Sequence, residues 1–314
     1  MIAVLGATGR IGGEVARRLA DQPVNARALV RRPDAADVPL PVVGADLTDP
    51  ASVRAALQGA SRLFLVTPHG PDQDLLEAVA IDAAADAGVE HVVKVSGGAA
   101  SLGPNGVTAT ARAHWRSERR IEASGMGFTF LRPSMFQQGV LDLPRPRGRL
   151  LLAPFGRAPI AMVDLRDVAA CAVAALLDPG PVSAPWQLTG PRGVTLEEVA
   201  ARLGARYVPV PPKLAARSLR RGGASAWEVE HALRMAAYFA AGADSAPTDH
   251  VLRLTGRPPR PVEALLANST NTESPWSPAS GTSPCTSPTS MPPSTSSSRS
   301  SAWSRPSAST APPT

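Results

Sequence analysis

Residues 1–13 read MIAVLGATGRIGG, a short apolar strand that runs into a glycine-spaced turn and the start of a helix. Gly6 permits the tight turn, Gly9 lets a ligand approach the backbone, and Gly12 lets helix and strand pack closely. A pyrophosphate binds at such a helix N-terminus because free N–H groups and the helix dipole favour negative charge. The stretch predicts a dinucleotide site that includes Gly6, Thr8, Gly9, Arg10, Ile11 and Gly12.

The residues after the second predicted strand, Val24–Val30, indicate which dinucleotide binds. Arg31 and Arg32 follow this strand directly, and no acidic residue appears before Asp34. An acid at this point would bind the ribose hydroxyls of NAD, whereas an arginine accommodates a 2′-phosphate. Arg10, inside the glycine turn, adds a third cation within reach. The pattern favours NADP(H); the alternative is that the arginine pair is simply a solvated turn in an arginine-rich chain.

Strand and helix signals alternate over the first half of the chain, as a parallel sheet with crossover helices requires. They predict an α/β fold with a doubly wound parallel sheet of the Rossmann type and a small C-terminal substrate lobe. The expected strands are 2–5, 24–30, 41–44, 63–66, 92–96 and 128–131. The expected helices between them include 14–20, 50–58, 73–87 and 110–124, the last two ending at glycines.

Residues that directly follow strands are further cofactor candidates, because ligands bind outside the carboxyl ends of strands in open sheets. Asp46, with Leu47 beside it, follows the third strand and could hydrogen-bond the adenine edge. A turn-forming aspartate explains the same residue equally well. Thr67 and Pro68 follow the fourth strand, on the side where the nicotinamide is expected.

The second half of the chain changes character. We expect one NAD(P)-binding domain over residues 1–267, with the substrate lobe formed mainly by 137–160 and 184–267. Asp164 and Asp167 open a helix, and an N-cap with an acid in the first turn explains them better than paired catalytic carboxylates. Residues 268–314 are dominated by Ser, Thr and Pro, so we expect a disordered tail.

Composition excludes several function classes. The hydrophobic content of 44% and charged content of 18% are typical of a soluble globular protein, and the apolar runs are too short to span a membrane. The net charge of +6 comes from arginines scattered among acids, which argues against nucleic-acid binding. Only Cys171 and Cys285 are present, and no export signal is visible, so a reducing cytoplasm is expected. The histidines show no metal-ligand spacing.

Four motifs together resemble the NmrA-like group of atypical short-chain dehydrogenases/reductases. They are GATGRIG at 6–12, VVKVS at 92–96, IEASGMGFTFLRP at 121–133 and VDLRDVA at 163–169. The resemblance covers residues 1 to about 267. It implies a Rossmann fold, NADP(H) binding, and either a reductase of quinones, dyes, enones or iminium compounds or a protein that binds NADP(H) only to sense redox state.

The Tyr-x-x-x-Lys pair of ordinary short-chain dehydrogenases is missing. Neither Tyr207 nor Tyr238 has a lysine four residues on. Alignment with the ene reductases of the group instead places His114 at the position of their lysine, with Thr110 one turn earlier. This leaves His114 as the candidate acid or ribose contact, or else a histidine that packs beside Trp115.

Two nearby polar residues complete the catalytic candidates. Ser96, at the end of the fifth strand, occupies the position from which reductases polarise a carbonyl, although a backbone-capping serine is an equal alternative. Glu118, one turn after His114, could orient or charge it. A structural acid is the preferred explanation for Glu118.

The candidate substrate wall follows Arg132 and Pro133. It comprises Met135, Phe136, Gln137 and Gln138; the alternative for the apolar pair is plain core. His69, which follows the strand on the nicotinamide side, is a further candidate. We expect an NADPH-dependent oxidoreductase that transfers hydride to an electron-poor small molecule, namely a quinone, enone or iminium compound, because such acceptors need little general acid. The alternative is a non-catalytic NADP(H)-binding redox sensor that acts through a protein partner. The sequence leaves open whether the chain is a monomer or a homodimer.

Overall fold

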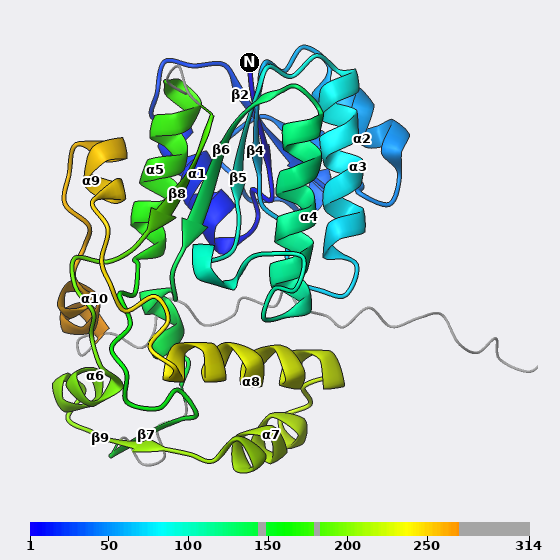
Figure 1. Cartoon of the computed structure of the whole chain (residues 1–314). Coiled ribbons are helices and arrows are strands. Elements are labelled where there is room, and N and C mark those ends of the chain that lie inside the picture. Colours follow the sequence, from blue (N-terminus) through cyan, green and yellow to red (C-terminus); the bar gives the residue numbers. More distant parts are fainter. Residues whose placement is uncertain (144–148, 179–182, 270–314) are drawn as a thin grey trace, which may run out of the picture. The chain divides into compact units, whose positions relative to one another are not determined.

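Seven parallel strands form the main sheet of the protein, in the order β3-β2-β1-β4-β5-β6-β8 (Figure 1). The computed structural model describes residues 1–143, 149–178 and 183–269, all within one unit, Met1–Thr272. The strands are β1 Ile2–Leu5, β2 Ala26–Val30, β3 Val42–Gly44, β4 Arg62–Leu65, β5 His91–Val95, β6 Gly127–Pro133 and β8 Ala184–Leu188.

Helices cover both faces of this sheet. On one face, α1 packs against α5 and α5 against α9; on the other, α3 lies between α2 and α4 (Figure 1). Their bounds are α1 Arg10–Ala20, α2 Pro50–Leu57, α3 Gln73–Asp86, α4 Ala109–Ala123, α5 Leu165–Leu177 and α9 His250–Thr255. The doubly wound parallel sheet expected from the sequence is therefore confirmed.

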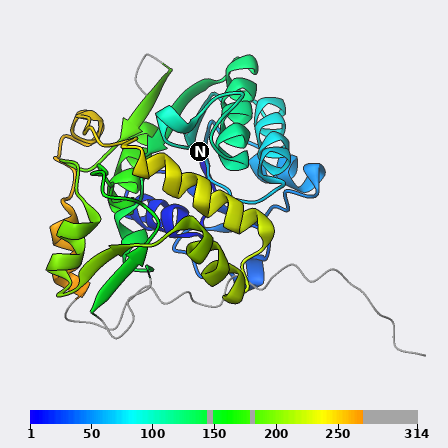
Figure 2. The ribbon, with the colours of Figure 1, turned by 60° about the horizontal axis from the view of Figure 1, so that its bottom comes forward.

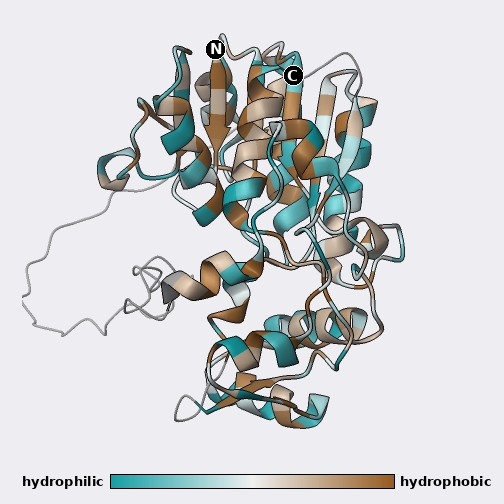
Figure 3. Cartoon of the chain, turned by 90° about the vertical axis from the view of Figure 1, so that its left-hand side faces the viewer, coloured by the Kyte–Doolittle hydropathy of each residue, from teal (hydrophilic) through white to brown (hydrophobic). Residues whose placement is uncertain are grey.

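The strands carry apolar side chains on both faces because both faces are covered by helices. Along β5, Val93 and Val95 belong to one hydrophobic cluster, with α1 and α5, while Val92 belongs to the cluster on the opposite face. Figure 3 shows the hydrophobic colours along the strands and hydrophilic patches on the outer helices. The direction in which successive strands are added to the sheet reverses between β1 and β4. The loops after these two strands therefore diverge and leave a crevice at the carboxyl ends of the strands.

A smaller lobe lies opposite the carboxyl ends of these strands. It contains the parallel pair of β7 and β9 and has its own hydrophobic cluster, which includes Leu151, Val199, Tyr207 and Phe239. Figure 2 shows its long helix α8 crossing in front of the main sheet. The elements are β7 Leu150–Ala153, α6 Leu196–Arg202, β9 Arg206–Pro209, α7 Pro212–Arg221, α8 Ala226–Ala240 and α10 Val262–Ser269.

Two segments that we expected in the lobe lie in the main layer instead. Residues Ala184–Leu188 form β8, the edge strand next to β6, and α9 packs on α5. Pro185 concealed this strand, since proline lacks the N–H that an inner strand needs and is tolerated at an edge. The tail expected over 268–314 lies, from residue 270 on, outside the described residues.

Candidate active site

A cavity of about 560 Å³ lies between the carboxyl ends of the strands and α8. The loops after β4, β5 and β6 contribute Thr67, Ser96 and Met135, and the helices α1 and α4 contribute Ile11 and His114. From the lobe, α8 and the segment after it close the other side, with these lining residues: His231, Ala232, Met235, Tyr238, Phe239 and Asp244. The sheet and the lobe thus make the cavity together.

The glycine turn fits a dinucleotide pyrophosphate. Gly6 has a φ of +83°, and a Cβ on it would lie 2.4 Å from the Val66 carbonyl oxygen. A Cβ on Gly12 would lie 2.1 Å from the Gly6 carbonyl oxygen, so helix and turn touch there. Gly9 caps α1 without a side-chain hydrogen bond, and the first turn carries no acidic residue. The backbone N–H groups at the start of α1 are therefore available to an anion without competition from a side-chain cap.

The three arginines expected at a 2′-phosphate differ in their surroundings. Arg31 and Arg32 are exposed at the carboxyl end of β2, next to β1. The Arg10 guanidinium lies 3.5 Å from the Asp142 carboxylate, and both side chains are about half exposed. Such a surface pair contributes little, typically under about 1 kcal/mol. Arg10 therefore starts from an ion pair that a phosphate would have to replace.

Asp46 forms a turn with its own neighbour. Its Oδ1 accepts hydrogen bonds from the backbone N–H and the hydroxyl of Thr48, at 2.9 and 2.8 Å. These bonds, together with the charge of Arg31, lower the pKa of Asp46. Leu47 packs partly buried against the core on the α2 side. Of the two explanations for Asp46, the structure supports the turn, and an adenine contact stays a prediction.

His114 is buried at the cavity wall and is held by polar side chains from two other elements. The Lys94 ammonium lies 3.2 Å from His114 Nδ1, and the Gln73 amide nitrogen lies 3.1 Å from the same atom. Because an ammonium only donates hydrogen bonds, Nδ1 must accept, which places the proton of the neutral ring on Nε2. Burial and then the Lys94 charge hold the pKa of His114 well below its ordinary value. His114 is therefore neutral at physiological pH.

A buried ion pair with Glu77 holds the Lys94 side chain in the core. Its Nζ lies 2.7 Å from Glu77 Oε2, with both side chains fully buried, and Thr67 donates to the other carboxylate oxygen at 2.8 Å. Burial opposes the charge on Glu77, but Lys94 and the hydrogen bonds outweigh it, so the pKa of Glu77 is lowered. The pair thereby ties α3 to β5 directly behind His114.

Ser96 and Glu118 belong to a second network. The Ser96 hydroxyl donates to Glu118 Oε1 at 2.7 Å, and Arg132 donates to the same oxygen at 3.0 Å. Among the described residues, Glu118 therefore orients Ser96 and Arg132, and His114 takes its partners from elsewhere. This agrees with the structural role preferred for Glu118, whose carboxylate binds Ser96 directly after β5 and Arg132 on β6. Ser96 lines the cavity, and its hydroxyl hydrogen is donated to Glu118.

The expected substrate wall divides into two pairs. Met135 and Phe136 line the cavity, as does His69. The Gln137 amide donates to the carbonyl oxygens of Met162 and Arg260. The Gln138 amide donates to Asp164 Oδ1 and accepts a hydrogen bond from the backbone at the start of α5. Gln137 and Gln138 are buried and lie outside the set of described cavity-lining residues, so their expected substrate contact is not what the structure shows. The Gln138 amide instead binds at the start of α5, and the Gln137 amide binds two backbone carbonyl oxygens.

Three histidine rings meet along one side of the cavity. The ring centroid of His69 lies 5.5 Å from that of His114 and 5.6 Å from that of His231 on α8, and Trp227 stacks on His231. Burial, and then the neighbouring His231, lower the pKa of His69 to about 4. Burial also lowers the pKa of His231. The cluster is therefore uncharged at neutral pH and is compatible with an apolar substrate.

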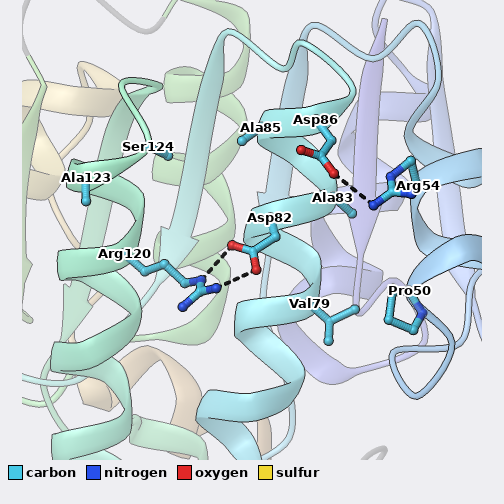
Figure 4. Close-up of a pocket in the computed structure, with 10 residues that line it drawn as sticks. All are labelled: Pro50, Arg54, Val79, Asp82, Ala83, Ala85, Asp86, Arg120, Ala123 and Ser124. Atoms are coloured by element: carbon cyan, nitrogen blue, oxygen red, sulfur yellow. Dashed lines mark hydrogen bonds and ion pairs between the residues drawn. The ribbon is translucent and has the colours of Figure 1, made fainter.

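A larger hollow, of about 670 Å³, lies over α2, α3 and α4 (Figure 4). Its charged side chains pair with one another: Arg54 with Asp86 at 2.9 Å, and Arg120 with Asp82 at 2.6 Å. It is remote from the glycine turn and offers no cluster of buried polar groups. Within the described ranges, no three metal-ligating side chains converge, and no helix is long and apolar enough to cross a bilayer.

Several residues that line the cavity or lie behind its wall were not singled out by the sequence analysis. Glu77, Gln73, His231 and Asp244 come from segments far apart in the chain, and no local pattern marks them. Lys94 did carry a signal, because the chain has only two lysines and this one interrupts an apolar strand. A charged residue inside a buried strand requires a buried partner. That argument would have indicated a site behind β5.

Comparison with known proteins agrees with this geometry. The model of the family described as NAD(P)H-binding matches residues 6–179, from the glycine turn to the end of α5. The chain belongs to the NAD(P)H-binding family. This membership confirms the nicotinamide cofactor and the resemblance stated above.

Relatives of this NAD(P)H-binding protein match it over most of their length. The NAD(P)H azoreductase of Xenophilus azovorans is 35% identical over 280 residues, which cover 83% of this chain and 94% of the relative. The (4-alkanoyl-5-oxo-2,5-dihydrofuran-3-yl)methyl phosphate reductase of Streptomyces griseus is 38% identical over 275 residues, 83% and 95% of the two chains. The Escherichia coli NADPH-dependent quinone oxidoreductase complexed with NADPH superposes with a TM-score of 0.78 at 24% identity, covering 86% of this chain and all of the other, and shows the shared fold.

Proposed function

We propose that this protein is an NADPH-dependent reductase that transfers hydride to an electron-poor small molecule. The observation that carries the proposal is the cavity beside the glycine turn, which is lined by apolar side chains such as Met135, Phe136 and Phe239. It opens at the switch point of the sheet, where a dinucleotide is expected. A cofactor bound there supplies the hydride, and the chain supplies orientation and exclusion of water.

The residues at the cavity determine which acceptors are suitable. His114 is neutral and Ser96 directs its hydrogen to Glu118, so neither is prepared to protonate a ketone oxygen during hydride transfer. Quinones, enones and iminium compounds delocalise or neutralise the developing charge and need mainly positioning. The names of the two relatives support this class, since an azo group and a dihydrofuran double bond beside an oxo carbon are both electron-poor.

The chain's own groups hold the cofactor by recognisable means. The N–H groups after Gly6 bind the pyrophosphate, and Arg31 and Arg32 contact a 2′-phosphate. On the nicotinamide side, Thr67 and His114 border the cavity. The Thr110 hydroxyl is buried there without a hydrogen-bond partner among the described residues, which leaves it free to bind a ligand.

The test is NADPH oxidation by the purified full-length chain with a panel of a benzoquinone, a cyclic enone, an iminium compound and a simple ketone. We expect turnover with at least one of the first three and little with the ketone. Tight NADPH binding without turnover on any acceptor would contradict the proposal and assign the protein to redox sensors. Efficient ketone reduction would contradict the acceptor class.

A further inference from the structure

Asp244 stands out by its backbone conformation. Of the described non-glycine residues, it alone has a positive φ, at 56°. Its carbonyl oxygen accepts a hydrogen bond from the Ala161 N–H at 2.8 Å, which anchors the segment after α8 to the strand-like residues before α5. Backbone strain of this kind persists where surrounding structure enforces it, and it is concentrated at functional sites. The turn holds the Asp244 side chain at the cavity.

The Asp244 carboxyl is positioned from both sides. Tyr238, near the end of α8, donates its hydroxyl hydrogen to Oδ1 of Asp244 at 3.0 Å. Oδ2 points to the loop after β5, where a Cβ on Gly98 would lie only 2.8 Å from it. Gly98 thus makes room for the carboxyl by having no side chain. No cation pairs with Asp244 within the part of the chain that the structure describes.

The surroundings favour a protonated carboxyl. Burial raises the pKa of Asp244, and the hydrogen bond from Tyr238 offsets this only in part. The other titratable groups at the cavity are Tyr238 and His231 on α8, His69 before α3, and His114 on α4. Burial, with Asp244 beside it, raises the pKa of Tyr238, and the histidines are uncharged.

We propose that Asp244, held by Tyr238, is the proton donor that completes reduction of the acceptor. This inference rests on the proposed function. With a quinone or enone, hydride brings one hydrogen and two electrons to the acceptor, whose π-electron pair moves to the electronegative end and leaves an anion. The Asp244 O–H bond then breaks, the proton bonds to this anion, and the electron pair stays on the carboxylate. Tyr238 stabilises that carboxylate until solvent returns a proton.

The direct test replaces Asp244 by asparagine and measures kcat against pH with the faster of the benzoquinone and the cyclic enone of the panel. Asparagine also tolerates the left-handed backbone but cannot release a proton. For the wild type we expect kcat to fall as pH rises through the pKa of Asp244. Asp244→Asn should lower kcat by about 100-fold or more and abolish this alkaline decline.

Two further variants separate proton donation from a structural role. Tyr238→Phe removes a hydrogen bond that lowers the Asp244 pKa, so the alkaline decline should move to higher pH while turnover persists. Asp249→Asn, at an exposed aspartate of the same segment, should leave both kcat and the profile unchanged. Wild-type kcat and profile in Asp244→Asn would overturn the proposal, as would a change confined to KM. A wild type without turnover would overturn the proposed function itself. A wild type with turnover that Asp244→Asn leaves unchanged would overturn only the role of Asp244, so the two failures are distinguishable.

Discussion

The Lys94 ammonium lies 3.2 Å from Nδ1 of His114 and donates a hydrogen bond to it. A lysine thus stands next to the residue expected in catalysis, but it comes from β5 instead of the same helix. Its charge is balanced by Glu77, so its effect on His114 is to fix the neutral ring with the proton on Nε2. A neutral ring suits hydride transfer to acceptors that need no acid at oxygen.

The first prediction concerns turnover without the His114 ring. His114→Ala should lower kcat with a quinone or enone by no more than about 10- to 100-fold, at or below the lower end for general acid catalysis. Part of the effect should appear in NADPH affinity. His250→Ala, on α9, serves as the control and should match the wild type. If the variant loses efficient ketone reduction that the wild type has, His114 is a general acid after all.

A second prediction is that buried, neutral His114 makes the fold sensitive to acid. Its pKa in the folded protein lies below the unfolded value near 6.5, so as pH falls below 6.5 the unfolded chain binds the proton first. This group alone should reduce the free energy of unfolding by up to about 1.4 kcal/mol per pH unit. The free energy of unfolding, measured in urea at pH 7.5, 6.5 and 5.5, should decrease less steeply with falling pH in His114→Gln than in the wild type. Equal slopes would contradict the neutral assignment.

The buried ion pair supplies a third prediction. Lys94→Met leaves the Glu77 carboxylate uncompensated in the core and should destabilise the fold by about 3–5 kcal/mol. Adding Glu77→Gln removes that charge while keeping an acceptor for Thr67, so the double variant should be more stable than Lys94→Met alone. Denaturant unfolding of the wild type, both single variants and the double variant measures this coupling. Additive losses would show that the two residues act independently.

Cofactor preference gives a fourth prediction. Arg31→Ala should remove charge-assisted hydrogen bonds worth about 1.5–3 kcal/mol, a loss of roughly 10- to 100-fold in affinity for NADP(H). NAD(H), which lacks the 2′-phosphate, should bind as before. Arg54→Ala, on the outer face of α2, is the matched control. Equal losses for both cofactors, or a wild type that prefers NADH, would refute the 2′-phosphate assignment.

A fifth prediction concerns residues 270–314, which are rich in Ser, Thr and Pro and contain few of the apolar residues that form a core. Their removal after Ser269, the last residue of α10, should leave the melting temperature and the NADPH affinity unchanged. A cut at this point keeps Leu265 and Leu266, which are buried. A drop of several degrees in the melting temperature would show that the segment stabilises the fold.

Local patterns in the sequence determined the main layer and the cofactor turn. Gly6, Gly9 and Gly12 are recognisable because turn, close approach and helix packing all depend on residues a few positions apart. The helix starts at Asp164 and Thr195 could be predicted for the same reason, since an N-cap bonds within its own first turn. The edge strand β8 escaped because its pairing with β6 is remote in sequence and Pro185 masks its pattern.

Only the tertiary structure decided which polar side chains face the cavity and which serve the core. Gln138 looked like a substrate contact by position, yet its amide completes the start of α5. Glu118 lies one turn from His114, yet it binds Ser96 and Arg132. Asp244 carried no signal at all, because its role depends on Tyr238, Gly98 and the cavity around them. A side chain's partner depends on which buried groups lie within hydrogen-bond reach, and that is settled by packing between segments far apart in the chain.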